Sequence, residues 1–183
     1  HTEVRRQRQM CIRDSYLFSV DQRVINNSGL SFDLYPYGLS KRQGIPEMQN
    51  FFILHEGPLS ITDGVLEEYD YDDLKDDKKI KHSSVGGWIG MTDKYWQTAI
   101  IPNQNEPVQQ TYSYSFVDNI DNFQTDIVGE RIAVSNNASI SHNFKIFAGP
   151  KIVNIIDKYM EEYGFDGFDR SVDFGWFLSL IHI

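Results

Sequence analysis

Apolar and polar residues alternate along much of the chain, and this pattern predicts β-strands. It is clearest in "QTYSYSFVD", where Tyr112, Tyr114 and Phe116 share one face and the intervening Thr and Ser residues share the other. Strand-like runs also occur in "YLFSVDQRV" (16–24), "ERIAVS" (130–135) and "HNFKIFAG" (142–149). Many short strands with turns between them favour a sandwich over alternating β-α-β units.

Turn signals separate these runs. "NNSG" at 26–29 and the pair Asp63-Gly64 are typical of tight turns, and Asp-Gly is a strong hairpin signal. We expect "HEGP" (55–58) to form another turn, with Gly57-Pro58 connecting two strands.

One helix is predicted in "GPKIVNIIDKYMEEYG" (149–164). Pro150 suits the first turn, and Gly164 suits the position just beyond the end. Apolar residues recur at helical spacing and would face a sheet, namely Ile152, Ile155, Ile156, Tyr159, Met160 and Tyr163.

The charged run "EEYDYDDLKDDKKIK" (67–81) suggests a calcium loop at first sight. Its spacing is wrong, because the fifth position counted from Asp70 is Leu74 and no glycine follows. We therefore expect a solvated surface loop here.

The segment "GGWIGMTDKYWQTAIIPN" (86–103) is the densest in glycine and aromatic residues. It could be a catalytic loop, a ligand platform or a pair of strands. Gly86-Gly87 leads into a strand-like stretch and not into a helix, so a phosphate cradle is not expected.

Composition narrows the class of protein. Aromatic residues make up 14% of the 183 residues, which suits a β-rich fold. The formal charge of −9 argues against a nucleic-acid partner. Cys11 is the only cysteine, so no disulfide can form within the chain. No apolar run approaches the roughly 20 residues of a membrane span.

Catalytic and metal-binding signatures are not evident. His55, His82 and His142 lie far apart without the spacing of a metal site, and the expected role of each is structural. His55-Glu56 could form an acid–base pair only through a turn, and it has no third partner. We predict no catalytic, cofactor-binding or metal-binding residue, and no cofactor.

Three segments, in the same order, resemble the periplasmic domain of the YidC family of bacterial membrane protein insertases. They are 86–103, "HEGPLSITDGVLEEYDYDDLK" (55–75) and "FKIFAGPKIVNIIDKYMEEYGFDGFDRSVDFGWF" (144–177). The resemblance implies an all-β fold, a β-supersandwich of two packed antiparallel sheets with a C-terminal amphipathic helix. It also implies that Trp88, Tyr95 and Trp96 are core or sheet-packing residues.

The resemblance further implies a non-enzymatic role in inserting and folding inner-membrane proteins. The expected partners are nascent membrane proteins and the Sec translocon with its accessory SecDF subunits. The expected place is the periplasmic face of the bacterial inner membrane, reached through flanking segments. The alternative is a sugar-binding or mutarotase-like supersandwich domain, in which stacked tryptophans beside carboxylates such as Asp93 would hold a pyranose ring.

The chain ends look foreign to this pattern. We expect 1–15 and 178–183 to be a non-native leader and tail of the kind that sequencing-adaptor translation produces. Without 1–15 there remain 13 Lys and Arg against 24 Asp and Glu. The expected layout is then the C-terminal part of a supersandwich at 16–148, truncated on its N-terminal side, a closing helix at 149–164 and a linker toward the membrane at 165–177.

Overall fold

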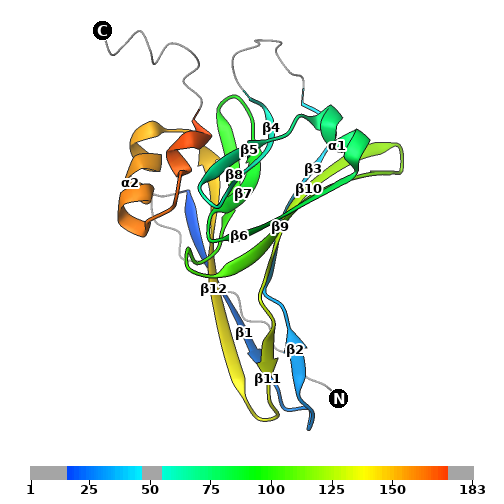
Figure 1. The fold of residues 1–183 in the computed structure, drawn as a ribbon, viewed down its shortest axis with the longest axis vertical. Coiled ribbons are helices and arrows are strands. Elements are labelled where there is room, and N and C mark those ends of the chain that lie inside the picture. The colour runs from blue at the N-terminus through cyan, green and yellow to red at the C-terminus, as the bar shows by residue number, and fades with distance from the viewer. Residues whose placement is uncertain (1–15, 47–54, 173–183) are drawn as a thin grey trace.

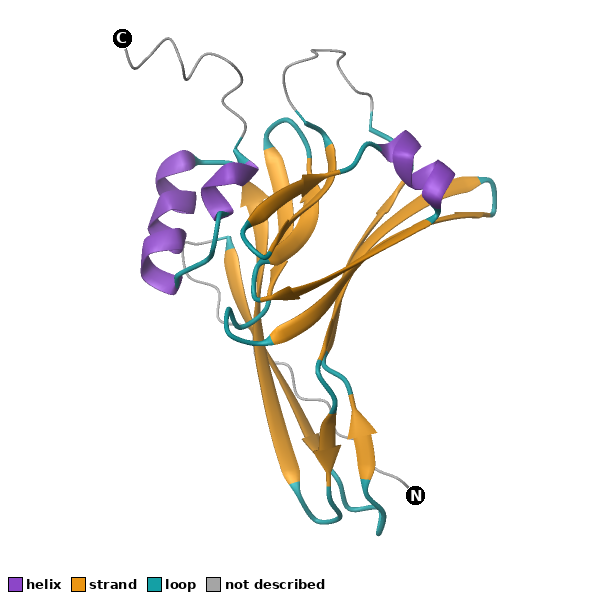
Figure 2. Ribbon diagram, viewed as in Figure 1, coloured by secondary structure: helices purple, strands orange, loops and turns teal. Residues whose placement is uncertain are grey.

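The computed structural model describes residues 16–46 and 55–172, and most of them lie in antiparallel strands (Figures 1 and 2). The strands are β1 (Leu17–Ile25), β2 (Phe32–Leu34), β3 (Tyr37–Gln43), β4 (Gly57–Thr62), β5 (Val65–Glu68), β6 (Lys79–Val85), β7 (Trp88–Thr92), β8 (Trp96–Ile101), β9 (Pro107–Val117), β10 (Ile120–Gly129), β11 (Ile132–Val134) and β12 (Ser139–Pro150). The helices are α1 (Tyr71–Asp77), α2 (Val153–Tyr163) and the 3₁₀ helix η1 (Phe168–Ser171).

Two larger sheets carry the fold. The first has six strands in the order β1-β12-β8-β7-β4-β5, and the second has four in the order β3-β10-β9-β6. Beyond the six-stranded sheet, β1 and β12 continue as a long ribbon beside the small β11–β2 sheet (Figure 1).

The six-stranded sheet is the central layer and is covered on both faces. On one face, Ile156 of α2 and Phe168 of η1 pack with Trp88 and Phe147 in a fully buried cluster. On the other face, a second cluster joins it to the four-stranded sheet and α1, with members that include Ile89, Ile100, Tyr112, Phe123 and Leu74. The predicted all-β sandwich with a C-terminal amphipathic helix is therefore confirmed.

The charged run does not form the loop that we expected, because residues 71–77 form α1. Tyr71 and Leu74, three residues apart, both turn inward and are buried, while the acidic residues face solvent. The Asp73 carboxylate accepts a hydrogen bond from the backbone N–H of Asp70 at 3.1 Å and so caps the first turn. Two apolar residues are enough to dock so short a helix.

Two expected boundaries are wrong. Gly57 and Pro58 do not form a turn, because they begin β4 and pair with β7. Pro58 lacks an N–H, but its carbonyl still accepts a hydrogen bond from the Tyr69 N–H at 3.0 Å, so it fits within the sheet.

The expected start of the C-terminal helix is also wrong, because Pro150 ends β12 and α2 begins only at Val153. The end of α2 agrees with the prediction, since Gly164 adopts the left-handed conformation with φ of 66°.

The segment 86–103 is the β7–β8 hairpin, so of the three possibilities the pair of strands is right. Trp88 is fully buried, as expected. The expectation for Tyr95 and Trp96 is wrong, because they are 65% and 58% exposed. Tyr95 lies in the turn between β7 and β8, and Trp96 is the first residue of β8.

Candidate functional site

The three central histidines lie in separate places, and each has a structural contact. His55 Nε2 is 3.2 Å from the Pro58 carbonyl oxygen, and His82 Nε2 is 2.8 Å from the Tyr69 hydroxyl. His142 Nε2 is 3.1 Å from a Glu106 carboxylate oxygen. In the part of the chain that the structure describes, no three His, Cys, Asp or Glu side chains gather as a metal site would require.

Asp93, the candidate carboxylate of a sugar site, is held by a charge pair. The Arg42 guanidinium of β3 donates a hydrogen bond to it, which ties the four-stranded sheet to the β7–β8 turn. Tyr71 of α1 lies beside this pair, and burial raises the pKa of its hydroxyl to about 12 although the Arg42 charge opposes the rise. The arrangement joins three elements and leaves Asp93 engaged by protein.

A series of buried hydrogen bonds between the two sheets was not predicted from the sequence. Ser60 and Thr62 hydroxyls lie 3.0 Å apart, and Thr62 donates to Gln110 Oε1 at 2.9 Å. The Gln110 amide in turn donates to the Ile61 carbonyl at 3.0 Å. Gln110 is fully buried, so these bonds satisfy its amide inside the core. Its position in an alternating strand predicts a buried face, but nothing local identifies the partner strand.

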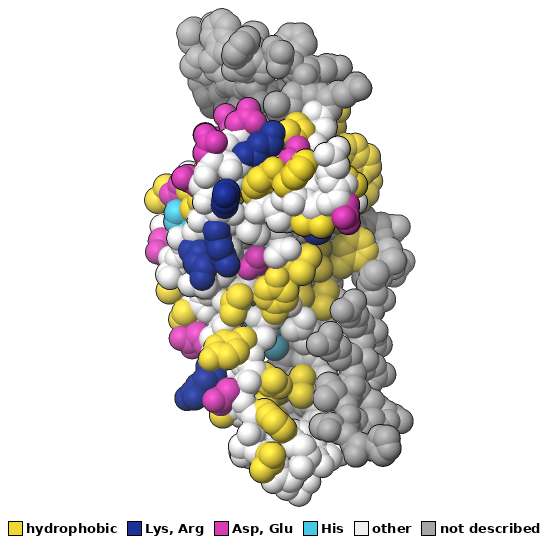
Figure 3. All heavy atoms as spheres, turned by 90° about the vertical axis from the view of Figure 1, so that its right-hand side faces the viewer, with side chains coloured by type: hydrophobic (Ala, Val, Ile, Leu, Met, Phe, Trp, Pro, Cys, Tyr) yellow, Lys and Arg dark blue, Asp and Glu magenta, His cyan; other side chains and the backbone are white. Residues whose placement is uncertain are grey.

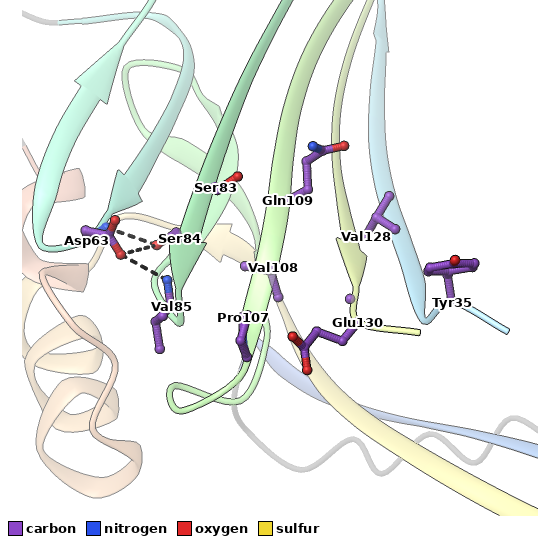
Figure 4. A pocket seen from close by; sticks show the side chains of 11 residues that line it. Tyr35, Asp63, Ser83, Ser84, Val85, Pro107, Val108, Gln109, Val128 and Glu130 are labelled. Atoms are coloured by element: carbon purple, nitrogen blue, oxygen red, sulfur yellow. Dashed lines mark hydrogen bonds between the residues drawn. The ribbon is translucent and has the colours of Figure 1, made fainter. Parts of the chain in front are cut away.

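A shallow groove of about 490 Å³ lies on the four-stranded sheet, where β6 and β10 end and β9 begins. Figure 4 shows Asp63 and Val85 on one side of it and Tyr35 on the other, with Glu130 between them. Its remaining lining residues are Ser83, Ser84, Pro107, Val108, Gln109, Val128 and Gly129.

Hydrogen bonds fix the side of the groove that Asp63 forms. The Asp63 carboxylate accepts a hydrogen bond from the Val85 N–H at 3.0 Å, and the Asp63 N–H donates to the Ser84 hydroxyl at 2.9 Å. The predicted Asp63-Gly64 hairpin thereby holds the end of β6, because Asp63 binds its backbone directly (Figure 4).

The floor of the groove continues as a row of side chains across all four strands. Ser83 pairs with Gln109, Gln109 with Val128, and Val128 with Tyr37. Tyr35, Tyr37 and Leu39 are exposed large apolar residues at this edge. Figure 3 shows hydrophobic side chains gathered along this side of the molecule. We call Tyr35, Tyr37 and Leu39 the apolar edge. Alternation predicts which residues point outward, but only the long-range pairing brings them together.

No helix within 16–46 or 55–172 has the length and apolar character needed to cross a bilayer.

The family model and the curated relatives agree on one family. The family model described as YidC periplasmic domain matches residues 2–182, a range that includes most of the predicted leader and tail. Membrane protein insertase YidC of Rickettsia canadensis (strain McKiel) is 38% identical over 165 residues, covering 90% of this chain and 30% of the relative. Membrane protein insertase YidC of Rickettsia prowazekii (strain Madrid E) is 37% identical over 164 residues, covering 89% and 29%.

Likeness to solved structures is weaker. A putative aldose 1-epimerase from Klebsiella pneumoniae aligns over 86% of this chain and 49% of its own, with a TM-score of 0.41 and 10% identity. A TPR-domain containing protein from Parabacteroides distasonis aligns over 74% and 28%, with a TM-score of 0.42 and 9% identity. Overlaps this low support no argument about function.

The chain spans about 30% of the length of the curated relatives it matches, and it belongs to the family of YidC periplasmic domains.

Proposed function

We propose that this chain is the non-catalytic periplasmic contact domain of a membrane protein insertase. It sits at the periplasmic face of the bacterial inner membrane and is joined to the membrane through flanking segments. Its role is to hold a binding surface for the Sec translocon, for the accessory SecDF subunits or for nascent membrane proteins.

The observation that carries this proposal is the groove together with the apolar edge. The two form one continuous outward surface, because Val128 of the groove pairs directly with Tyr37 of the edge. Exposed aromatic and aliphatic side chains that border a hollow are typical of polypeptide-binding surfaces. The groove offers apolar contact from Val85 and Pro107, with Asp63 and Glu130 available to basic groups of a partner.

The sugar-binding alternative finds less support in the geometry. Trp88 is fully buried and cannot stack on a sugar ring. Trp96 is exposed beside the turn, but Asp93 is already paired with Arg42. A pyranose site needs an exposed aromatic ring for stacking and free polar groups beside it. The turn at Trp96 supplies only the aromatic ring.

A photo-crosslinking amino acid at Tyr37 tests the proposal. The full chain that carries it is mixed with purified Sec translocon and SecDF, or with a stalled ribosome that displays a nascent membrane protein. We expect irradiation to give an adduct with at least one of them, because Tyr37 lies on the surface proposed to bind them.

Val65 on β5 is the matched control, since it is also exposed but lies on the other large sheet. Equal adducts from both positions, or none from Tyr37, would contradict the proposed surface. Heat release on titration with hexoses would instead support the sugar-binding alternative.

A further inference from the structure

The β7–β8 turn presents an exposed aromatic tip. Tyr95 and Trp96 are both more than half exposed, and Ile152, next to the start of α2, is exposed too. The Lys151 N–H donates to the Tyr95 carbonyl at 2.8 Å, which holds these two segments together. Lys94 Nζ lies 5.1 Å from the centre of the Tyr95 ring. Aromatic rings beside lysines are the pairing that favours the headgroup level of membranes.

The β9–β10 hairpin presents a second exposed apolar tip. Phe116, Val117 and Ile120 flank its two-residue turn at Asp118-Asn119, and all three are exposed. The inward row of β9 is buried from Val108 to Tyr112, whereas Phe116 at the far end of the same row is exposed. No packing within the described fold requires apolar residues at this tip.

Both tips lie at the same end of the long axis of the molecule (Figure 1). Helix η1, which is followed by the last described residue Val172, lies at this end as well. The β11–β2 sheet and the end of the β1–β12 ribbon lie at the opposite end.

We propose that the end formed by the two tips rests on a lipid bilayer, with Trp96, Tyr95, Phe116, Val117 and Ile120 in its headgroup region. Two separate protrusions suit this environment. A protein partner of ordinary affinity needs a complementary area of roughly 800 Å² on each side, whereas a bilayer interface deforms around individual side chains. The relatives are named membrane protein insertases, so a bilayer lies close to the domains they contain.

The charge of this end favours zwitterionic over anionic lipid. Helix α1 lies at the same end (Figure 1) and exposes Asp72, Asp73, Asp76 and Asp77. These carboxylates are repelled by an anionic surface, so the contact depends on apolar burial and weakens as the anionic fraction rises.

Quenching of tryptophan fluorescence by brominated phosphatidylcholine tests the proposal. The full chain, with Trp176→Phe in every variant so that the tryptophan next to the tag does not contribute, is attached through a C-terminal histidine tag to vesicles with a trace of nickel-chelating lipid, which raises its local concentration. We expect brominated lipid to quench the fluorescence, Trp96→Ala to remove most of that quenching, and Val117→Asp to reduce it from the second tip. Added phosphatidylglycerol should lower the quenching, and Asp76→Asn with Asp77→Asn should restore part of it.

Leu30→Asp is the matched control, because Leu30 is 65% exposed and lies beside β2 at the opposite end. It should leave the quenching unchanged. Quenching that is absent in the original chain, or that survives both Trp96→Ala and Val117→Asp, overturns the proposal. So does an equal loss with Leu30→Asp. Thermal melts of each variant exclude loss of the fold as the cause, and the result does not depend on whether Tyr37 crosslinks to a protein.

Discussion

At the scale of the residue, Tyr71 shows how a small helix is locked to the sandwich. Its ring meets the Phe123 ring edge-on, with centres 4.7 Å apart. The Arg42–Asp93 pair lies beside its hydroxyl. Because the ring is almost completely buried, ionising the hydroxyl in the folded protein is costly, and its pKa rises from 10.0 to about 12.

Tyr71→Phe should therefore change how stability falls at high pH. A raised pKa in the folded state gives stability that is complete below pH 10 and is lost as the pH rises toward 12. We expect the original chain to lose on the order of 2 kcal/mol more than Tyr71→Phe over this interval. Urea unfolding at a series of pH values measures the difference, and the two curves should be parallel between pH 7 and 9. Curves that stay parallel up to pH 12 would show that burial of this hydroxyl is not linked to stability.

At the scale of the element, the β7–β8 hairpin depends on a close approach between its own strands. A Cβ atom on Gly90 would collide with the carbonyl oxygen of Thr98 on the neighbouring strand. The backbone cannot move aside easily, because β7 and β8 are both inner strands of the six-stranded sheet. The glycine in this motif is thus a packing requirement.

Gly90→Ala should destabilise the fold by more than about 3 kcal/mol, since the obstacle is backbone in a sheet core. Gly129→Ala is the matched control, because its Cβ would lie 3.3 Å from Pro36 side-chain atoms that can shift. Chemical denaturation of both variants gives the comparison. A Gly90→Ala midpoint that matches that of Gly129→Ala would rule out the close approach as a determinant.

Elements were predictable from sequence where a local pattern sufficed. The Asp63-Gly64 hairpin, the strand over 110–118 and the end of α2 at Gly164 all follow from residues next to one another. Helix α1 could not be predicted, because its two apolar residues are too few for a periodic signal and its docking depends on Phe123, distant in sequence. The positions of Pro58 and Pro150 inside strands likewise depend on neighbouring strands that the local sequence does not reveal.

At the scale of the whole molecule, the six-stranded sheet is shared by two cores. Phe168 packs edge-on against Trp88 and Phe147 on one face, with ring centres 5.4 and 5.3 Å apart. Phe123 belongs to the core on the other face. Loss of either cluster exposes the same central strands, so the two cores should unfold together.

Phe168→Ala and Phe123→Ala should each lower the melting temperature, at a cost of about 3–5 kcal/mol apiece. Both should keep a single calorimetric transition, because the shared sheet couples the two cores. Tyr163→Ala, at an exposed ring of α2, is the control and should have a much smaller effect. Two resolved transitions in either core variant would show that the faces fold independently.

The composition of the candidate surface, formed by the groove and the apolar edge, was the hardest feature to predict from sequence. The surface joins Ser83, Gln109 and Val128 of the groove to Tyr37 of the apolar edge. These residues come from four strands and approach one another only through sheet pairing. Alternation indicates that each points away from the core, but it carries no information on their neighbours. The same limit explains Tyr95 and Trp96, since aromatic character predicts burial whereas their place at a hairpin turn leaves them in solvent.

The β1–β12 ribbon gives the molecule a fixed length. Nine consecutive residue pairs join its strands, from Leu17 with Phe147 to Ile25 with Ser139, and span about 27 Å at roughly 3.4 Å per residue. The length of the ribbon therefore sets the distance between the two ends of the molecule. An insertion of two residues in each strand would lengthen it by about 7 Å and keep every side chain on its face, whereas one residue in each would turn the faces over. A change of two residues per strand would therefore alter the reach of this domain and leave its faces as they are.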